Sequence, residues 1–283
     1  MTRGSGEPAV PTTRPAAATS PAAGEPAGAA YLSELFGLHG RTAMVTGASR
    51  GLGAAMAIAL ARAGARVCLV GRSGNLGATA AAIAAAGGEA VSLVGDLTTE
   101  AGIAALAAEA LERCGAVDIL VNNAGTFVRK PALEWTAADW DEVADLSTRS
   151  VFLLSQRLAA PMLERRHGKI INVASVLAFQ GGFTVPAYAA SRHALVGLTR
   201  ALANEWAGRG VNVNAIAPGY IDTDLLHDLK HDPRRSADLL ARVPAGRWGA
   251  ADELAGAAVY LASDASSFVH GATLVVDGGW LSR

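Results

Sequence analysis

Residues 46–53 have the sequence Thr-Gly-Ala-Ser-Arg-Gly-Leu-Gly, and they connect a short apolar run to a long alanine-rich stretch. Glycines at 47, 51 and 53 allow a tight turn and let a pyrophosphate approach backbone amides at the start of a helix. A glycine-rich string alone is weak evidence, but its place between a predicted strand and a predicted helix is typical of a dinucleotide-binding turn. We therefore expect cofactor contacts from Gly47, Ser49, Arg50, Gly51, Leu52 and Gly53.

On both sides of this turn, short apolar runs alternate with long stretches rich in alanine and leucine. Strands that are apolar throughout and separated by helices indicate a parallel sheet covered on both faces. The pattern predicts one α/β domain of the Rossmann type, a doubly wound, parallel, seven-stranded sheet with helices on both faces. The predicted strands are 42–46, 66–70, 90–94, 119–121, 169–173, 211–216 and 273–276. The predicted helices lie near 51–63, 75–86, 99–113, 137–165, 187–208 and 251–262.

The composition excludes several classes of protein. The 283 residues are 51% hydrophobic and carry a net charge of −1, which argues against a nucleic-acid or acidic-membrane partner. No apolar run reaches the roughly 18 residues of a membrane span, and residues 1–30 lack the apolar segment of a signal peptide. Cys68 and Cys114 each lie in an apolar stretch, as expected of core residues in a reducing compartment. We therefore expect a cytoplasmic enzyme.

The first 30 residues differ from the rest. They are rich in Pro, Ala, Gly, Ser and Thr and have no hydrophobic period. Such a segment cannot bury enough apolar surface to offset the entropy lost on ordering. We predict a disordered tail over 1–30, followed by one domain over 31–283.

The end of the second predicted strand bears on the choice of cofactor. An acidic side chain there selects NAD by binding the ribose 2′-hydroxyl, whereas an arginine can hold the 2′-phosphate of NADP. This chain has Gly71-Arg72, and Arg50 offers a second guanidinium to the same phosphate. The pattern favours NADP(H). NAD(H) stays possible, because arginine is so abundant in this chain that Arg72 can reflect composition alone.

Two further segments end predicted strands, at Asp96-Leu97 and at Asn123-Ala124-Gly125. Open α/β sheets bind their ligands at the carboxyl ends of the strands, so we expect both segments at the cofactor. The Asp96 carboxylate suits an adenine amino group, and it equally suits the N-cap of the next helix.

Ser175, Tyr188 and Arg192 form the predicted chemical centre. Tyr188 and Arg192 are four residues apart in a predicted helix and so share one face. A free phenol loses its proton only near pH 10, and a fixed cation nearby stabilises the phenolate. A serine hydroxyl can donate to an oxygen that becomes negative during a reaction. The six histidines show no metal-ligand spacing, so we predict no metal.

Together with Pro218-Gly219, these motifs resemble the short-chain dehydrogenase/reductase family over about residues 38–283. The resemblance implies that Tyr188 is the general acid and base, that Ser175 positions the carbonyl or hydroxyl, and that a nicotinamide cofactor carries the hydride. It also implies a lid over the substrate at about 220–243. Cofactor contacts are then expected from Tyr188, Arg192, Pro218, Gly219, Ile221 and Thr223.

The chain departs from the family pattern at two catalytic positions. Arg192 stands where the family has a lysine, and Ser147 stands where it has an asparagine. Arginine keeps the positive charge but is wider and does not deprotonate. Three interpretations follow: a working reductase with a modified proton relay, a slow or specialised enzyme, and a cofactor-binding protein with little turnover.

Stretches within 175–182, 204–207, 213–220, 243–249 and 276–283 resemble a subgroup, the 2-dehydro-3-deoxy-D-gluconate 5-dehydrogenases. This implies a small, polar sugar-acid substrate; the rival is a ketoreductase acting on a secondary-metabolite intermediate. Arg129 suits a substrate carboxylate, although a solvated loop arginine fits as well. Gln180 suits a sugar hydroxyl, Tyr220 is expected in the pocket, and Trp280 suits a core or subunit contact. The resemblance also implies a homotetramer or homodimer.

Overall fold

The computed structural model describes residues 27–283, which form the predicted alternation of strands and helices. The strands are β1 (Thr42–Thr46), β2 (Arg66–Gly71), β3 (Ala90–Val94), β4 (Ile119–Asn122), β5 (Gly168–Val173), β6 (Val211–Pro218) and β7 (Thr273–Val276). The helices are α1 (Ala27–Phe36), α2 (Gly51–Arg62), α3 (Gly77–Ala85), α4 (Glu100–Cys114), α5 (Ala137–Ala144), α6 (Ser150–Glu164), α7 (Pro186–Trp206), α8 (His227–His231), α9 (Pro233–Leu240) and α10 (Ala255–Ala262).

The strands form one sheet in the order β3-β2-β1-β4-β5-β6-β7, and all neighbours run parallel. This confirms the predicted fold class. The strand order reverses direction between β1 and β4. In a doubly wound sheet this reversal opens a crevice at the carboxyl ends of the strands, where a ligand binds.

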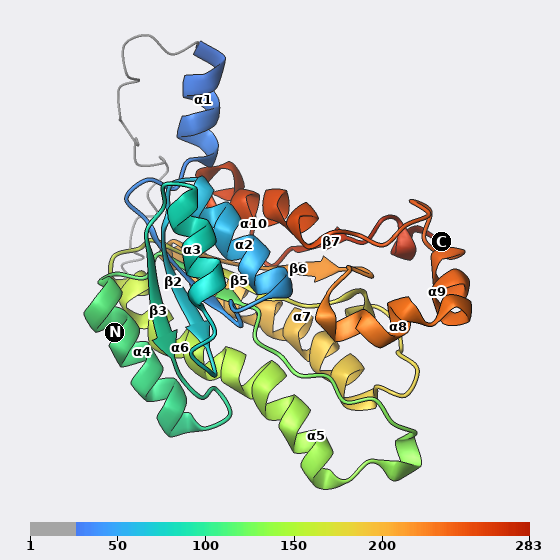
Figure 1. Cartoon of the computed structure of the whole chain (residues 1–283). Helices are drawn as coiled ribbons and strands as arrows, with labels where there is room; N and C mark the ends of the chain where they lie inside the picture. Colours follow the sequence, from blue (N-terminus) through green and yellow to red (C-terminus); the bar gives the residue numbers. More distant parts are fainter. Residues whose placement is uncertain (1–26) are drawn as a thin grey trace, which may run out of the picture.

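Helices cover both faces of the sheet (Figure 1). One core layer holds Leu60 of α2 and Leu261 of α10, together with alternate residues of β1 such as Val45. The other holds Leu158 of α6 and Trp206 of α7. Because β1 is buried on both faces, its three central residues, Ala43 to Val45, are all apolar instead of alternating with polar residues.

Most element ends shift by a few residues from the predictions, and two differences are larger in kind. The predicted single helix over 137–165 is two helices, α5 and α6, joined by a turn of π-helix at Asp145–Arg149. Of the predicted tail, residues 1–26 lie outside the described residues, and residues 27–30 already belong to α1. The tail prediction was therefore wrong for these last four residues.

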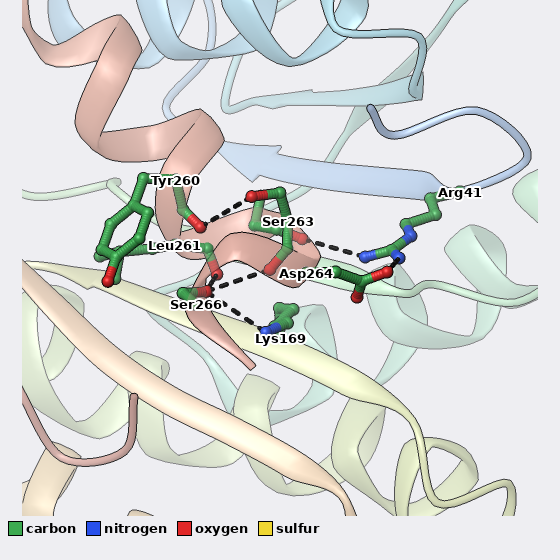
Figure 2. Close-up of polar contacts among 8 residues, drawn as sticks. Arg41, Lys169, Tyr260, Leu261, Ser263, Asp264 and Ser266 are labelled. Carbon is green, nitrogen blue, oxygen red and sulfur yellow. Dashed lines mark hydrogen bonds and ion pairs between the residues drawn. The ribbon is translucent and has the colours of Figure 1, made fainter. Parts of the chain in front are cut away.

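The amino ends of the strands are held by polar contacts on the side of the sheet away from the crevice. Figure 2 shows Arg41, just before β1, paired with Asp264 at 2.8 Å. The buried Lys169 ammonium of β5 donates to Ser266 Oγ at 3.3 Å. These contacts fasten the segment between α10 and β7 to the sheet. Over residues 27–283 no helix has the length and apolar character needed to cross a membrane.

Candidate active site

The loops that follow β1 to β6 surround a cavity of about 760 Å³ at the carboxyl ends of the strands. Of the predicted site residues, those that line it are Gly47, Ser49, Arg50, Gly51, Leu52, Arg72, Asp96, Leu97, Asn123, Ala124, Gly125, Arg129, Ser175, Tyr188, Arg192, Pro218, Gly219, Tyr220, Ile221 and Thr223. Gly53, Ser147 and Gln180 do not line it. Gly53 and Ser147 lie behind its wall, and in the loop of Gln180 the lining residues are Gly182 and Phe183.

The glycine turn has the geometry that a pyrophosphate needs. Gly47 and Gly51 have positive φ angles of 65° and 56°, a conformation that side chains other than glycine rarely adopt. A Cβ on Gly53 would lie 2.2 Å from the Gly47 carbonyl oxygen, so only glycine lets α2 approach the turn this closely. The amino end of α2 therefore faces the cavity with its first amides unobstructed, as a dinucleotide requires.

Thr46 connects the glycine turn to the next loop. Its Oγ1 accepts hydrogen bonds from the backbone amides of Asn123 and Ala124, both at 3.0 Å. The Asn123 side chain in turn donates to the carbonyl oxygens of Thr46 and Gly47. These bonds join the loop after β1 to the loop after β4, and so they fix the distance between the two sides of the crevice.

The cavity end near β2 and β3 carries Arg72 and Asp96, two charged residues that the sequence predicted at the cofactor. Arg72 has no carboxylate within 4.0 Å among the described residues, whereas Arg50 pairs with Asp224 at 3.2 Å. The Asp96 carboxylate accepts from the Thr98 amide and hydroxyl at 2.9 and 2.7 Å. These bonds, with the nearby Arg72, hold the pKa of Asp96 below its usual value. The N-cap interpretation of Asp96 was wrong, because Thr99 caps α4.

Ser175 and Tyr188 reach the cavity from adjoining segments. Ser175 ends the loop after β5, and its Oγ accepts the Leu177 amide at 3.1 Å, which leaves the hydroxyl proton for another acceptor. Tyr188 lies in the first turn of α7, which Pro186 begins. The Tyr188 ring packs edge-on against Phe127, with centroids 5.1 Å apart.

Arg192 lies one turn further along α7 and is 6% exposed. Its guanidinium carbon is 4.5 Å from the centroid of the Tyr188 ring, and Nη1 donates to the Val173 carbonyl at 3.0 Å. A Cβ on Gly125 would lie 2.7 Å from Arg192 Nη2, so the glycine makes room for the guanidinium. The cation is thus held against the tyrosine between the ends of β4 and β5.

Ser147 lies in the π-helical turn between α5 and α6, and it is fully buried. Its Oγ has no hydrogen-bond partner within residues 27–283. A Cβ on Gly125, which would lie 2.7 Å from Arg192 Nη2, would lie 3.6 Å from Ser147 Oγ. Its hydroxyl is therefore close to Arg192 but separated from the cavity.

The other end of the cavity is aromatic and basic. Tyr220 packs edge-on against Trp280 and Trp248, with centroids 4.6 and 6.1 Å apart, and burial raises the pKa of the Tyr220 phenol. Trp280 is buried with Val176, Leu239 and Val243 of the same chain, so it makes a core contact. Helices α8 and α9 lie beside the cavity and contribute Leu229, Arg235 and Leu239 to its lining.

Sequence reasoning missed Arg235, Phe127 and Phe183, all of which line the cavity. Phe127 is two residues from Gly125, so its position next to a predicted site offered a signal. Arg235 lies in the lid that the family resemblance implied, but nothing in the sequence singled it out within that segment, because its place depends on how the segment after β6 folds back over the sheet. In the described part of the chain, no three His, Cys, Asp or Glu side chains are grouped as metal ligands.

Comparisons with known proteins agree with this geometry. A family model described as "Enoyl-(Acyl carrier protein) reductase" matches residues 47–281. The 2-dehydro-3-deoxy-D-gluconate 5-dehydrogenase of Bacillus subtilis is 47% identical over 89% of this chain and 99% of its own length.

Two solved structures are also similar to the chain. One from Beutenbergia cavernae with bound NADP is 50% identical with a TM-score of 0.85, covering 88% of this chain and 99% of the other. The gluconate 5-dehydrogenase of Burkholderia cenocepacia, in complex with NADP and tartrate, is 41% identical with a TM-score of 0.85, covering 89% and 99%. With the glycine turn, the strand order and the positions of Ser175 and Tyr188, these matches show that the chain belongs to the short-chain dehydrogenase/reductase family.

Proposed function

We propose that this enzyme transfers a hydride between NADP(H) and a carbonyl or secondary alcohol of a sugar acid. The observation that carries the proposal is the placement of Ser175, Tyr188 and the buried Arg192 cation in one cavity with the glycine turn. The relatives named above support a sugar acid as the substrate class, since their names are those of gluconate and deoxygluconate dehydrogenases.

The residues divide the proton chemistry between them. In the reductive direction Ser175 donates a hydrogen bond to the substrate carbonyl oxygen, and Tyr188 delivers a proton to that oxygen as it becomes negative. In the oxidative direction Tyr188 accepts the proton from the hydroxyl. Arg192 stabilises the Tyr188 phenolate, which is left after reduction and is needed at the start of oxidation, and the bond from Arg192 to the Val173 carbonyl keeps the guanidinium in place. Bound nicotinamide supplies or accepts the hydride.

The cavity suits a phosphorylated dinucleotide. The amino end of α2 borders the cavity and supports a contact with the pyrophosphate, and Asp96 in the cavity wall supports a contact with the adenine. Arg72, with no carboxylate within 4.0 Å in residues 27–283, supports a contact with the 2′-phosphate, and two similar structures contain NADP. NADP(H) is therefore the preferred cofactor, ahead of NAD(H).

The two rivals receive less support. Arg192 lies with its guanidinium against the Tyr188 ring, which favours turnover over mere cofactor binding. No relative named above points to a secondary-metabolite ketoreductase. We place the enzyme in the cytoplasm as a homotetramer or homodimer; the partly exposed Phe152 of α6 supports a subunit contact on that helix.

The proposed function is tested by the change in absorbance at 340 nm with NADPH and NADH, using 2-dehydro-3-deoxy-D-gluconate, D-gluconate and their keto or hydroxy partners. Wild type and Arg192→Lys are measured side by side. We expect turnover by wild type, because the arginine already holds a cation against Tyr188. A silent wild type with an active Arg192→Lys variant identifies a cofactor-binding protein instead. Silence in both overturns the substrate assignment.

Arg72→Ala is expected to raise KM for NADPH and leave KM for NADH unchanged. A lost charge-assisted contact to phosphate corresponds to a factor of about 10 to 100. The matched control is Arg62→Ala, because Arg62 is an exposed arginine at the far end of α2 that does not line the cavity. Equal changes for the two cofactors place the 2′-phosphate contact elsewhere.

A further inference from the structure

Two positive side chains from different parts of the chain line the same cavity. Arg129 lies in the loop after β4, and Arg235 lies in α9. The pKa of Arg129 is lowered, first by partial loss of its surrounding water and then by the positive charge of Arg235. The two guanidinium groups are therefore close enough to repel each other.

Neither group is paired with an anion among the residues that the structure describes. Within residues 27–283, no carboxylate lies within 4.0 Å of Arg129 or Arg235, although Arg50 and Arg247 pair with Asp224 and Glu253. Asp224, the lid carboxylate that lines the cavity, is already engaged by Arg50. A pair of unneutralised guanidinium groups is a site where an anionic ligand removes a repulsion and gains charge-assisted hydrogen bonds.

The position of the pair assigns the anion to the substrate. The guanidinium carbon of Arg129 is 5.3 Å from the centroid of Phe127, whose ring is 5.1 Å from that of Tyr188. One aromatic side chain thus separates this cation from the proton donor. Arg50 and Arg72 follow β1 and β2, on the other side of the crevice, where the cofactor phosphates are expected.

The segment that carries Arg235 packs over this end through apolar side chains. Leu226, Leu229 and Leu239 line the cavity beside it, and Leu239 also packs on Val243 and Trp280. Arg242 is not available for the site, because its guanidinium lies over the Trp280 ring at 4.0 Å. Arg235 is thus placed to bring the segment 220–243 against a ligand held by Arg129.

We propose that Arg129 and Arg235 jointly bind the carboxylate of the substrate, so that the lid 220–243 closes on acids in preference to neutral polyols. This inference rests on the proposed function and specifies which group of the sugar acid the site recognises. It makes Arg235 a residue that determines specificity for the acid.

The test compares D-gluconate with D-glucitol, which has the same carbon skeleton but a hydroxymethyl group in place of the carboxylate. Dissociation constants are measured by titration calorimetry on NADP⁺-loaded protein. The variants are Arg129→Gln, Arg235→Gln and Arg235→Lys, with Arg234→Gln as the matched control because Arg234 is an exposed neighbour in α9 that does not line the cavity.

We expect wild type to bind gluconate more tightly than glucitol and each glutamine variant to bind gluconate about 10- to 100-fold more weakly. Glucitol and NADP⁺ binding stay unchanged in both variants, Arg235→Lys retains most of the gluconate affinity, and Arg234→Gln behaves as wild type. Unchanged gluconate binding in Arg235→Gln, or an equal loss for gluconate and glucitol, overturns the proposal.

If the variant effects appear but no sugar acid is turned over, the carboxylate site stands and the proposed reaction fails. If sugar acids are turned over and the variants bind gluconate normally, the proposed reaction stands and the carboxylate site fails.

Discussion

Tyr188→Phe lowers kcat by about 10²- to 10⁴-fold, because the variant has no phenolic proton to exchange with the substrate oxygen. The ring itself stays in place, held edge-on by Phe127 at 5.1 Å and covered by the Arg192 guanidinium at 4.5 Å. Cofactor affinity and thermal stability therefore change little. The measurement is single-turnover kinetics with NADPH, combined with the NADPH dissociation constant from fluorescence.

The control for this variant is Tyr260→Phe, since Tyr260 lies in α10 and does not line the cavity. It is expected to keep wild-type kcat. A Tyr188→Phe enzyme with more than about a tenth of wild-type kcat assigns the proton transfer to another group. Ser175 is then the next candidate for the donor, and Ser175→Ala in the same background decides the point.

The sheet could be predicted almost to the residue, because each strand is a short, mostly apolar run that lies between two helical stretches. The strand residues 42–46, 90–94 and 273–276 match the structure at both ends. The helical stretch 137–165 could not be divided in advance, since its apolar pattern continues through the π-helical turn. The π-helical turn inserts one extra residue into the helix and places Ser147 inside the protein. The spacing of the apolar residues in the sequence does not show this insertion.

Site residues were predictable where a strand end positions them and much less so on long connections. Asp96 and Gly125 follow strands directly, and both line the cavity. Gln180 lies in a loop that turns at Gly181-Gly182, and here Phe183 lines the cavity instead. Arg235 depends on the fold of a 54-residue connection between β6 and β7, residues 219–272. The position of such a segment is decided by packing on distant residues such as Trp280.

Gly53→Ala is expected to weaken cofactor binding about 10- to 100-fold while leaving the rest of the sheet folded. The new Cβ would lie 2.2 Å from the Gly47 carbonyl oxygen and 2.5 Å from Asn123 Nδ2. The first of these atoms belongs to the backbone and cannot turn away, so α2 must move from the glycine turn. Strain of about 1–3 kcal/mol at the turn corresponds to a factor of roughly 10 to 100 in affinity.

The same helix movement also breaks the bonds by which Asn123 holds the turn, so the loss should fall on NADPH and NADH alike. An equal loss for the two cofactors distinguishes Gly53→Ala from Arg72→Ala, which is expected to weaken the binding of NADPH alone. The matched control is Gly256→Ala in α10, where a Cβ meets no atom within 4 Å and a helical alanine should stabilise the fold by about 0.5–1 kcal/mol. Calorimetric titration of both cofactors and thermal unfolding of both variants make the comparison. Wild-type cofactor affinity in Gly53→Ala would contradict the assignment, because the close contact of α2 with the glycine turn would then not be needed to bind a dinucleotide.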